Sequence, residues 1–422
     1  MRDAISLRAA HRGMAALSRP ASQSARDAAA AVLSSRLVIW CAGAGAFLVH
    51  GANDPRVPHV GPVRDALLAP VSRWDAVHLQ LIAEHGYSRG SSGFSAKDLT
   101  AFFPGYPLAA RAAGELFGSL LLGGVLVSMA ALVAALVLLH RLTELDLGTS
   151  AARRTVLLVA FFPTAVFLSA FYSESLFLAL SVGSIYAGRR GRWAIAGALG
   201  AFASVTRNTG VLLVVPLLLL YLYGPRADRG DGTPTGGRGW RPRYPLRADA
   251  LWIAVVPAGL LAFCAFTWIR FGDPLATFHA QVAWHRSLGA PLSAVWYAIP
   301  KTVEAAGELF TDSHDPFESP TAKLMLFGAL ALAIVAIVGV FRSRLPSAYG
   351  VYAALALAAP LSNPIPAPPL MSLPRFIAVI FPIQMWLAIK TERPARFAIV
   401  LGVLAAMCVV LTAKFAIWDF AG

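Results

Sequence analysis

Residues 119–140, Ser-Leu-Leu-Leu-Gly-Gly-Val-Leu-Val-Ser-Met-Ala-Ala-Leu-Val-Ala-Ala-Leu-Val-Leu-Leu-His, contain no Asp, Glu, Lys or Arg. A helix of this length crosses a hydrocarbon core of ~30 Å, because each helical residue rises about 1.5 Å. Residues 323–341 form a second apolar block of similar length. Each block predicts a transmembrane helix.

The composition of the whole chain agrees with this prediction. Of the 422 residues, 57% are hydrophobic and 14% are charged, and the mean hydropathy is +0.63. A soluble domain carries roughly a quarter charged residues. The chain therefore does not have the composition of a soluble enzyme, a nucleic-acid regulator or a disulfide scaffold. Its three cysteines, Cys41, Cys264 and Cys408, lie inside apolar blocks and are expected to pack as small hydrophobic residues.

Apolar segments recur along the chain, and together they predict an all-α polytopic membrane protein with about eleven transmembrane helices. Some segments are short for a span and could be tilted, broken or re-entrant. The predicted spans lie near 37–51, 119–140, 155–172, 174–188, 193–206, 209–223, 250–270, 323–341, 347–361, 376–389 and 397–414.

The basic residues predict the orientation of these spans. Of the 36 Lys and Arg residues, 23 fall in alternate connecting segments, together with only 7 of the 22 Asp and Glu residues. Cytoplasmic loops carry such a basic excess, so the net charge of +14 indicates topology rather than nucleic-acid binding. The segments assigned to the cytoplasm are 1–36, 141–154, 188–192, 224–247, 342–344 and 390–396.

The same orientation gives the domain organisation. A basic cytoplasmic tail, 1–36, precedes a transmembrane catalytic domain, 37–414, in which 224–247 is a flexible basic linker that touches anionic headgroups. The long segments 52–118 and 271–322 and the short, proline-rich 362–375 face the extracytoplasmic side, as does the C-terminal tail 415–422. We expect the function in these outer segments, where the acidic and aromatic residues gather.

The first outer segment contains a candidate catalytic acid. Residues 72–87 read as a short interfacial helix that Gly86 terminates, and Asp75 and His78 share one of its faces. A carboxylate there could act as the general base for a sugar hydroxyl. The alternative is structural, because Ser72-x-x-Asp75 also matches a capping box.

Several motifs resemble those of one family. They are Arg73-Trp74-Asp75 with His78, Ile82-Ala83 and Gly86-Tyr87; Ala101-Phe102-Phe103-Pro104 with Pro107; Phe162-Pro163; Phe171-Tyr172-Ser173-Glu174-Ser175-Leu176-Phe177; and Thr206-Arg207-Asn208-Thr209-Gly210. Weaker matches are Gly272-Asp273-Pro274-Leu275 and Ser372-Leu373-Pro374-Arg375-Phe376. In this order, over most of residues 37–390, they resemble the PIG-V mannosyltransferases, which add the second mannose during GPI-anchor assembly, and their bacterial relatives.

The resemblance implies a GT-C glycosyltransferase that uses a polyprenyl-phosphate-linked sugar on the extracytoplasmic face of the cell membrane. In that class an acid of the first outer loop is usually the base, and Asp75 matches it. The expected partners are the polyprenyl-phosphate-sugar donor, a glycolipid or glycan acceptor and the lipid bilayer, without nucleic acid. The acceptor and the sugar stay open, and the Arg-rich N-terminus and the basic 224–247 loop depart from the eukaryotic family. The Ala-, Arg- and Gly-rich composition suggests a bacterial member.

Such chemistry requires a base and cations that receive the phosphate charge. A single displacement inverts the anomeric centre and needs one carboxylate only. Arg207 and Arg375, each at a membrane boundary, are the candidate phosphate-binding cations, although arginines at such places also snorkel to headgroups. Glu174 could line the site or pair with Arg207. The residues expected to line the substrate site are Trp74, His78, Phe103, Tyr172, Glu174 and Asn208.

Residues 278–286 place polar and aromatic groups on one short helix, which suits either sugar stacking or an interfacial helix. No carboxylate or histidine cluster has metal-like spacing, so neither a metal nor another cofactor is expected. Two rival functions remain. One is a GT-C enzyme for another sugar, and the other is a transporter or lipid flippase, which the absence of repeat halves and the near absence of acids within the spans disfavour.

Overall fold

The computed structural model describes residues 22–50, 61–90, 93–229, 242–286, 289–308, 320–365 and 370–419. Within these ranges the chain is helical and forms no β-strand, which confirms the all-α fold class. Parts of segments 1–36, 52–118, 224–247, 271–322, 362–375 and 415–422 lie outside the described residues.

Four helices in the described part of the chain are long and apolar enough to cross a membrane. A bent pair, η5 (Ala248–Val255) and α11 (Ala258–Phe271), passes the same test as one span with a 43° bend. The chain is thus a multi-pass membrane protein. The four helices are α2 (Ser22–His50), α6 (Leu120–Leu147), α14 (Pro320–Phe341) and α18 (Pro394–Ala416).

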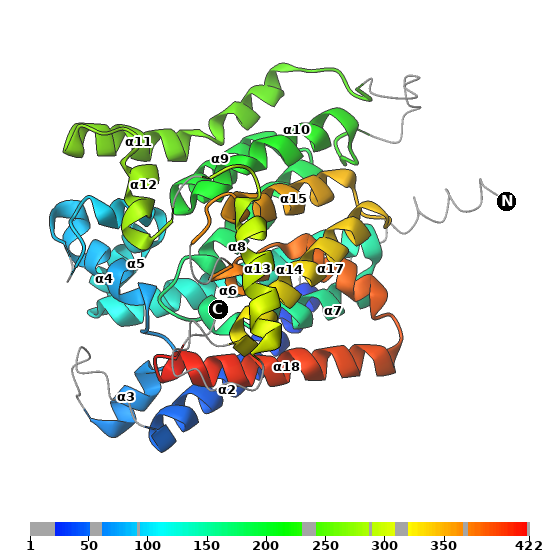
Figure 1. Cartoon of the computed structure of the whole chain (residues 1–422). Helices are drawn as coiled ribbons and strands as arrows, with labels where there is room; N and C mark the ends of the chain where they lie inside the picture. The colour runs from blue at the N-terminus through cyan, green and yellow to red at the C-terminus, as the bar shows by residue number, and fades with distance from the viewer. Residues whose placement is uncertain are drawn as a thin grey trace.

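The remaining predicted spans are shorter helices, and they do not establish a count of eleven. Helices α9 (Trp193–Thr206) and α15 (Ser347–Leu361) have the predicted bounds. Beside them lie α8 (Glu174–Arg189), η4 (Asn208–Leu213) with α10 (Val214–Tyr223), and α16 (Leu373–Ala378) with α17 (Phe381–Lys390). Helices α6 and α8 occupy the centre of the bundle, and α2 and α18 pack side by side at its edge (Figure 1).

The predicted span over 155–172 is wrong in its second half. Helix α7 (Thr149–Ala160) ends early, and residues 161–173 contain only a single helical turn, η3 (Ala165–Leu168). Pro163 lacks a backbone N–H, which disfavours a continuous helix. The irregular segment is buried in protein, where non-helical backbone is tolerated at membrane depth.

The first helix also differs from the prediction, because α2 begins at Ser22 rather than near residue 37. Its buried Arg36 donates hydrogen bonds to the carbonyl oxygens of Ala160 and Ala165, at 2.8 and 2.9 Å. Arg36 therefore satisfies backbone groups that the irregular segment leaves without helical partners.

Segments assigned to the same side of the membrane meet in the fold. At one end, Asp146 pairs with Arg189, and Arg344 approaches Glu392 at 3.5 Å. At the other end, the first and second outer segments pack together through α12 (Ala276–His279) and η2 (Asp98–Ala101). These contacts group the loops at two ends of the bundle, and the side of the membrane that each end faces stays a prediction.

Candidate active site

Asp75 is the first residue of α4 (Asp75–His85), which Gly86 terminates as the sequence predicts. The capping-box alternative is not formed, since no side chain caps the helix and the residue before it is Trp74. One carboxylate oxygen of Asp75, Oδ2, instead accepts a hydrogen bond from Nη1 of Arg375 at 2.6 Å. The Asp75 side chain is 29% exposed, so a substrate can reach it.

The irregular segment 161–173 fixes the backbone ahead of Asp75. The Phe171 N–H donates to the Val71 carbonyl at 2.8 Å, and the Tyr172 hydroxyl donates to the Arg73 carbonyl at 2.9 Å. Trp74, between Arg73 and Asp75, has φ 57°, a value that L-residues rarely adopt. Backbone strain of this kind persists only where surrounding contacts hold it, and such places are often functional sites.

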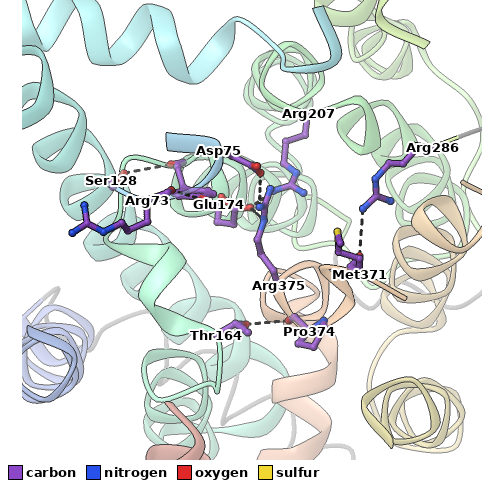
Figure 2. A network of polar contacts seen from close by, with 11 residues as sticks. Arg73, Asp75, Ser128, Thr164, Glu174, Arg207, Arg286, Met371, Pro374 and Arg375 are labelled. Atoms are coloured by element: carbon purple, nitrogen blue, oxygen red, sulfur yellow. Dashed lines mark hydrogen bonds and ion pairs between the residues drawn. The ribbon is translucent and has the colours of Figure 1, made fainter. Parts of the chain in front are cut away.

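Glu174 connects the two predicted cations. Its side chain is fully buried, and its Oε1 accepts hydrogen bonds from Nη1 of Arg207 and Nε of Arg375, each at 2.7 Å. Its Oε2 has no hydrogen-bond partner among the described residues. Of the two roles left open for Glu174, the structure shows the pairing role, extended to a second arginine. Figure 2 shows how Asp75, Glu174, Arg207 and Arg375 converge from separate elements.

Glycines bring these elements close together. A Cβ on Gly105, at the start of α5 (Gly105–Phe117), would lie 2.6 Å from Oγ1 of Thr206. A Cβ on Gly210 would lie 2.3 Å from the backbone of Ala203. Glycine at both positions therefore allows the close packing that sets the direction of Arg207.

A cavity of about 310 Å³ opens beside the Asp75 carboxylate. Asp75, Arg207 and Arg375 line it, and so do Phe103, Tyr172 and Asn208 of the predicted substrate-site residues.

The other three residues predicted to line the substrate site, Trp74, His78 and Glu174, do not line this cavity. Trp74 packs on Trp418 with ring centroids 5.7 Å apart, and Glu174 lies behind the arginines.

His78 belongs to an aromatic cluster rather than to the cavity wall. Its ring stacks on Phe102 at 5.6 Å and meets the edges of Phe94 and Trp284. Burial lowers the pKa of His78 below its usual value, although the Asp75 charge opposes this. The cluster holds the turn η6 (Ala280–Trp284) against the first outer segment.

An ion-pair cluster reinforces that attachment. Asp273 Oδ2 lies 2.9 Å from both Nζ of Lys97 and Nδ1 of His279. Hydrogen bonds from His279 and Lys97 lower the pKa of Asp273 to about 2, so the carboxylate stays ionised at neutral pH. The second outer segment is thereby held beside the cavity by both charged and aromatic contacts.

Sequence reasoning missed four cavity residues of this second segment. They are Phe278, Gln281, Trp284 and Arg286, and all four line the cavity. The polar and aromatic pattern of 278–286 was their only signal, and it suits an interfacial helix equally well. Among the described residues, no group of three or more His, Cys, Asp or Glu side chains could hold a metal ion.

Comparison with known proteins gives a family match and several sequence relatives, each over part of the chain. Residues 51–221 match the family model described as mannosyltransferase (PIG-V). GPI alpha-1,6-mannosyltransferase 2 of Rattus norvegicus is 36% identical over 39% of this chain and 35% of its own length. The Mus musculus protein is 33% identical over 50% and 43%, and GPI mannosyltransferase 2 of Cryptococcus neoformans is 30% identical over 37% and 38%. The matches thus cover less than half the length of these relatives.

Among solved structures, the archaeal oligosaccharyltransferase AglB from Archaeoglobus fulgidus, in complex with an inhibitory peptide and a dolichol-phosphate, aligns with a TM-score of 0.46 and 11% identity. The alignment covers 92% of this chain and 56% of that one. The range that the family model matches includes Asp75, Glu174 and Arg207 but not Arg286 or Arg375. By sequence, residues 51–221 are thus similar to the PIG-V mannosyltransferase family.

Proposed function

We propose that the protein is an integral-membrane glycosyltransferase of GT-C type. It transfers mannose from a polyprenyl-phosphate-mannose donor to a hydroxyl group of a lipid-linked or protein-linked acceptor, on the extracytoplasmic face. The sequence relatives are named mannosyltransferases, which supports mannose as the transferred sugar. The observation that carries the proposal is the partly exposed Asp75 carboxylate at the wall of a cavity that three arginines also line.

Asp75 is the general base in this proposal. Its Oδ2 is held by Arg375, and among the described residues no donor hydrogen-bonds to Oδ1. Oδ1 is therefore open to accept the proton of the acceptor hydroxyl. The acceptor oxygen attacks the anomeric carbon, and the bond from that carbon to the phosphate oxygen breaks with its electron pair on the phosphate. One displacement occurs, so the configuration of the sugar inverts.

The arginines stabilise the charge that develops on the phosphate. Arg207 and Arg375 are each 14% exposed and line the cavity, so they can donate charge-assisted hydrogen bonds in a medium of low dielectric constant. Glu174 is a positioning residue, because it holds both guanidinium groups without lining the cavity. We propose no metal or cofactor in this reaction.

The test is a transfer assay with purified protein in lipid nanodiscs. Polyprenyl-phosphate-mannose is compared with the glucose, galactose and arabinose donors, against a mixture of membrane glycolipid acceptors. We expect transfer from the mannose donor and its loss in Asp75→Asn. Transfer of a different sugar would replace mannose by that sugar. No transfer from any donor, with the protein folded, would contradict a glycosyltransferase and favour the transport alternative.

A further inference from the structure

Arg286 is the cavity cation that the proposed mechanism has not used. Its Nη1 and Nη2 donate to the carbonyl oxygens of Asn363 and Met371, at the long distances of 3.4 and 3.3 Å. Its guanidinium also lies 5.8 Å from the Phe376 ring. Among the described residues, no carboxylate lies within ion-pair distance of it. Figure 2 shows its side chain directed towards Met371.

The other two arginines of the cavity are already neutralised. Arg375 pairs with Asp75 and Glu174, and Arg207 pairs with Glu174. Two carboxylates thus face three guanidinium groups, which leaves one positive charge in and around the cavity. The unbalanced charge is that of Arg286, because it alone of the three has no carboxylate partner in the described structure.

An uncompensated cation in this place is costly. Burial, followed by repulsion from Arg375, lowers the pKa of Arg286 to about 10. The backbone at this position is also held, because the Arg286 N–H donates to the Gln281 carbonyl at 2.9 Å. Arg286 is half-buried, and charges that are removed from water in proteins are normally paired. An anionic ligand in the cavity would supply the missing partner.

We propose that Arg286 binds the phosphate group of a polyprenyl-phosphate lipid and is the main contact for the leaving phosphate. A phosphodiester carries one negative charge, which matches the single unbalanced cation. Guanidinium groups bind phosphate through paired hydrogen bonds. The apolar and aromatic residues that line the same cavity, including Phe278, Trp284 and Ile380, suit the first prenyl units.

The proposal rests on the proposed function for the role of the lipid and deepens it. When the anomeric bond breaks, its electron pair stays on the phosphate oxygen, and the phosphate becomes a monoester with additional negative charge. The acceptor proton has moved to Asp75. Arg286 then faces a more negative ligand than in the ground state, so its contact strengthens as the bond breaks.

The experiment measures lipid binding without requiring turnover. Purified protein in nanodiscs is titrated with a short-chain polyprenyl phosphate, with the matching polyprenol and with inorganic phosphate. The variants are Arg286→Gln, Arg286→Lys and the control Arg270→Gln. Arg270 is an exposed arginine at the end of α11, near the same segment, and it does not line the cavity.

We expect Arg286→Gln to weaken polyprenyl phosphate binding about 10- to 100-fold, the usual effect of losing a charge-assisted hydrogen bond. Polyprenol binding should not change. Arg286→Lys keeps the charge and should retain binding to within about 10-fold, because the ammonium still contacts phosphate as a point charge. Arg270→Gln should bind as the wild type does.

Unchanged phosphate affinity in Arg286→Gln would overturn the proposal, as would an equal loss of phosphate and polyprenol binding, which indicates collapse of the cavity. Displacement by inorganic phosphate at a concentration comparable to that of the lipid would exclude the lipid as the source of the anion. If Arg286→Gln does not fold, the same binding titrations with Arg286→Lys test the proposal. A retained preference for the phosphate over the alcohol supports the proposal, and a lost preference overturns it.

The binding assay also separates this inference from the proposed function. A wild-type protein that binds polyprenyl phosphate through Arg286 but transfers no sugar would contradict only the transferase. A wild-type protein that transfers mannose while Arg286→Gln keeps its phosphate affinity would contradict only the role of Arg286.

Discussion

Asp75 and Arg375, 300 positions apart in the sequence, form an ion pair of 2.6 Å at the wall of the cavity. Arg375 also reaches Glu174, so a single guanidinium joins the first outer segment to the start of α8. This bridge orients the carboxylate that the sequence motif identifies. It also means that each substitution in the site changes more than one contact.

Asp75→Asn should reduce turnover by about 10²- to 10⁴-fold, the usual contribution of a positioned base. The amide keeps the size of the side chain and can still accept a hydrogen bond from Arg375, whose charge stays paired with Glu174. The melting temperature should therefore change little. Initial rates at saturating donor and acceptor, normalised to folded protein, measure the effect.

Asp98→Asn is the matched control for Asp75→Asn. Asp98 lies in the same outer segment and accepts local hydrogen bonds from Ser95, but it does not line the cavity. Its variant should keep near-normal turnover. A well-folded Asp75→Asn with wild-type turnover, or an inactive Asp98→Asn, would move the base away from Asp75.

Glu174→Gln should destabilise the protein by about 3–5 kcal/mol, because removing one partner of a buried ion pair leaves the other charge uncompensated. Two arginines lose their shared carboxylate here. Thermal unfolding in detergent measures the loss of stability, and the donor KM of the surviving folded fraction should also change, since both arginines can move.

The control for Glu174→Gln is Asp146→Asn, which breaks the Asp146–Arg189 pair at the opposite end of the bundle. It should lower stability and leave the donor KM unchanged. If both variants change only stability, Glu174 does not position the cavity arginines.

Acidification should weaken the packing of the outer segments through His78. Burial lowers the pKa of His78, so the folded protein favours the neutral ring. The unfolded chain takes up a proton first as the pH falls below about 6.5, and the stabilising contribution declines from there towards the lower pKa of the folded state. Melting temperatures between pH 7.5 and 5 should therefore fall less steeply in His78→Phe, which keeps a ring in the cluster but cannot titrate. Identical slopes would show that His78 does not contribute.

The apolar pattern of the sequence predicts helix positions well. It fails where a helix contains charged side chains whose partners lie far away in the sequence. The predicted bounds of α9 and α15 agree with the structure. The start of α2 does not, because Arg26, Asp27 and Arg36 interrupt the apolar run. Arg36 is buried because distant carbonyl groups accept its hydrogen bonds. No local pattern contains that information.

In the candidate site, too, some residues can be predicted from local sequence and others cannot. Asp75, Arg207 and Arg375 can be selected from motifs and from the cost of charge at a membrane boundary. Their connection through Glu174 depends on how four segments fold together, so the sequence leaves two roles open for that residue. Arg286 is not distinguishable from a solvated arginine in an acid-rich loop. Two features of the structure distinguish Arg286 from such a residue. It lies close enough to Arg375 for the two charges to repel, and it has no carboxylate partner among the described residues.

The orientation of the protein in the membrane is the last prediction, and it decides whether the donor approaches from the extracytoplasmic side. Ser88, in the first outer segment, and Ser150, in a segment assigned to the cytoplasm, are both exposed. A cysteine at position 88, in a background without Cys41, Cys264 and Cys408, should react with an impermeant thiol reagent in intact cells. A cysteine at position 150 should react only after permeabilisation, because the basic residues around it favour the cytoplasm. Labelling at position 150 in intact cells, with none at position 88, would invert the topology and place the Asp75 cavity on the cytoplasmic side. A donor that is a nucleotide sugar would then fit the site better than a polyprenyl-linked one presented outside.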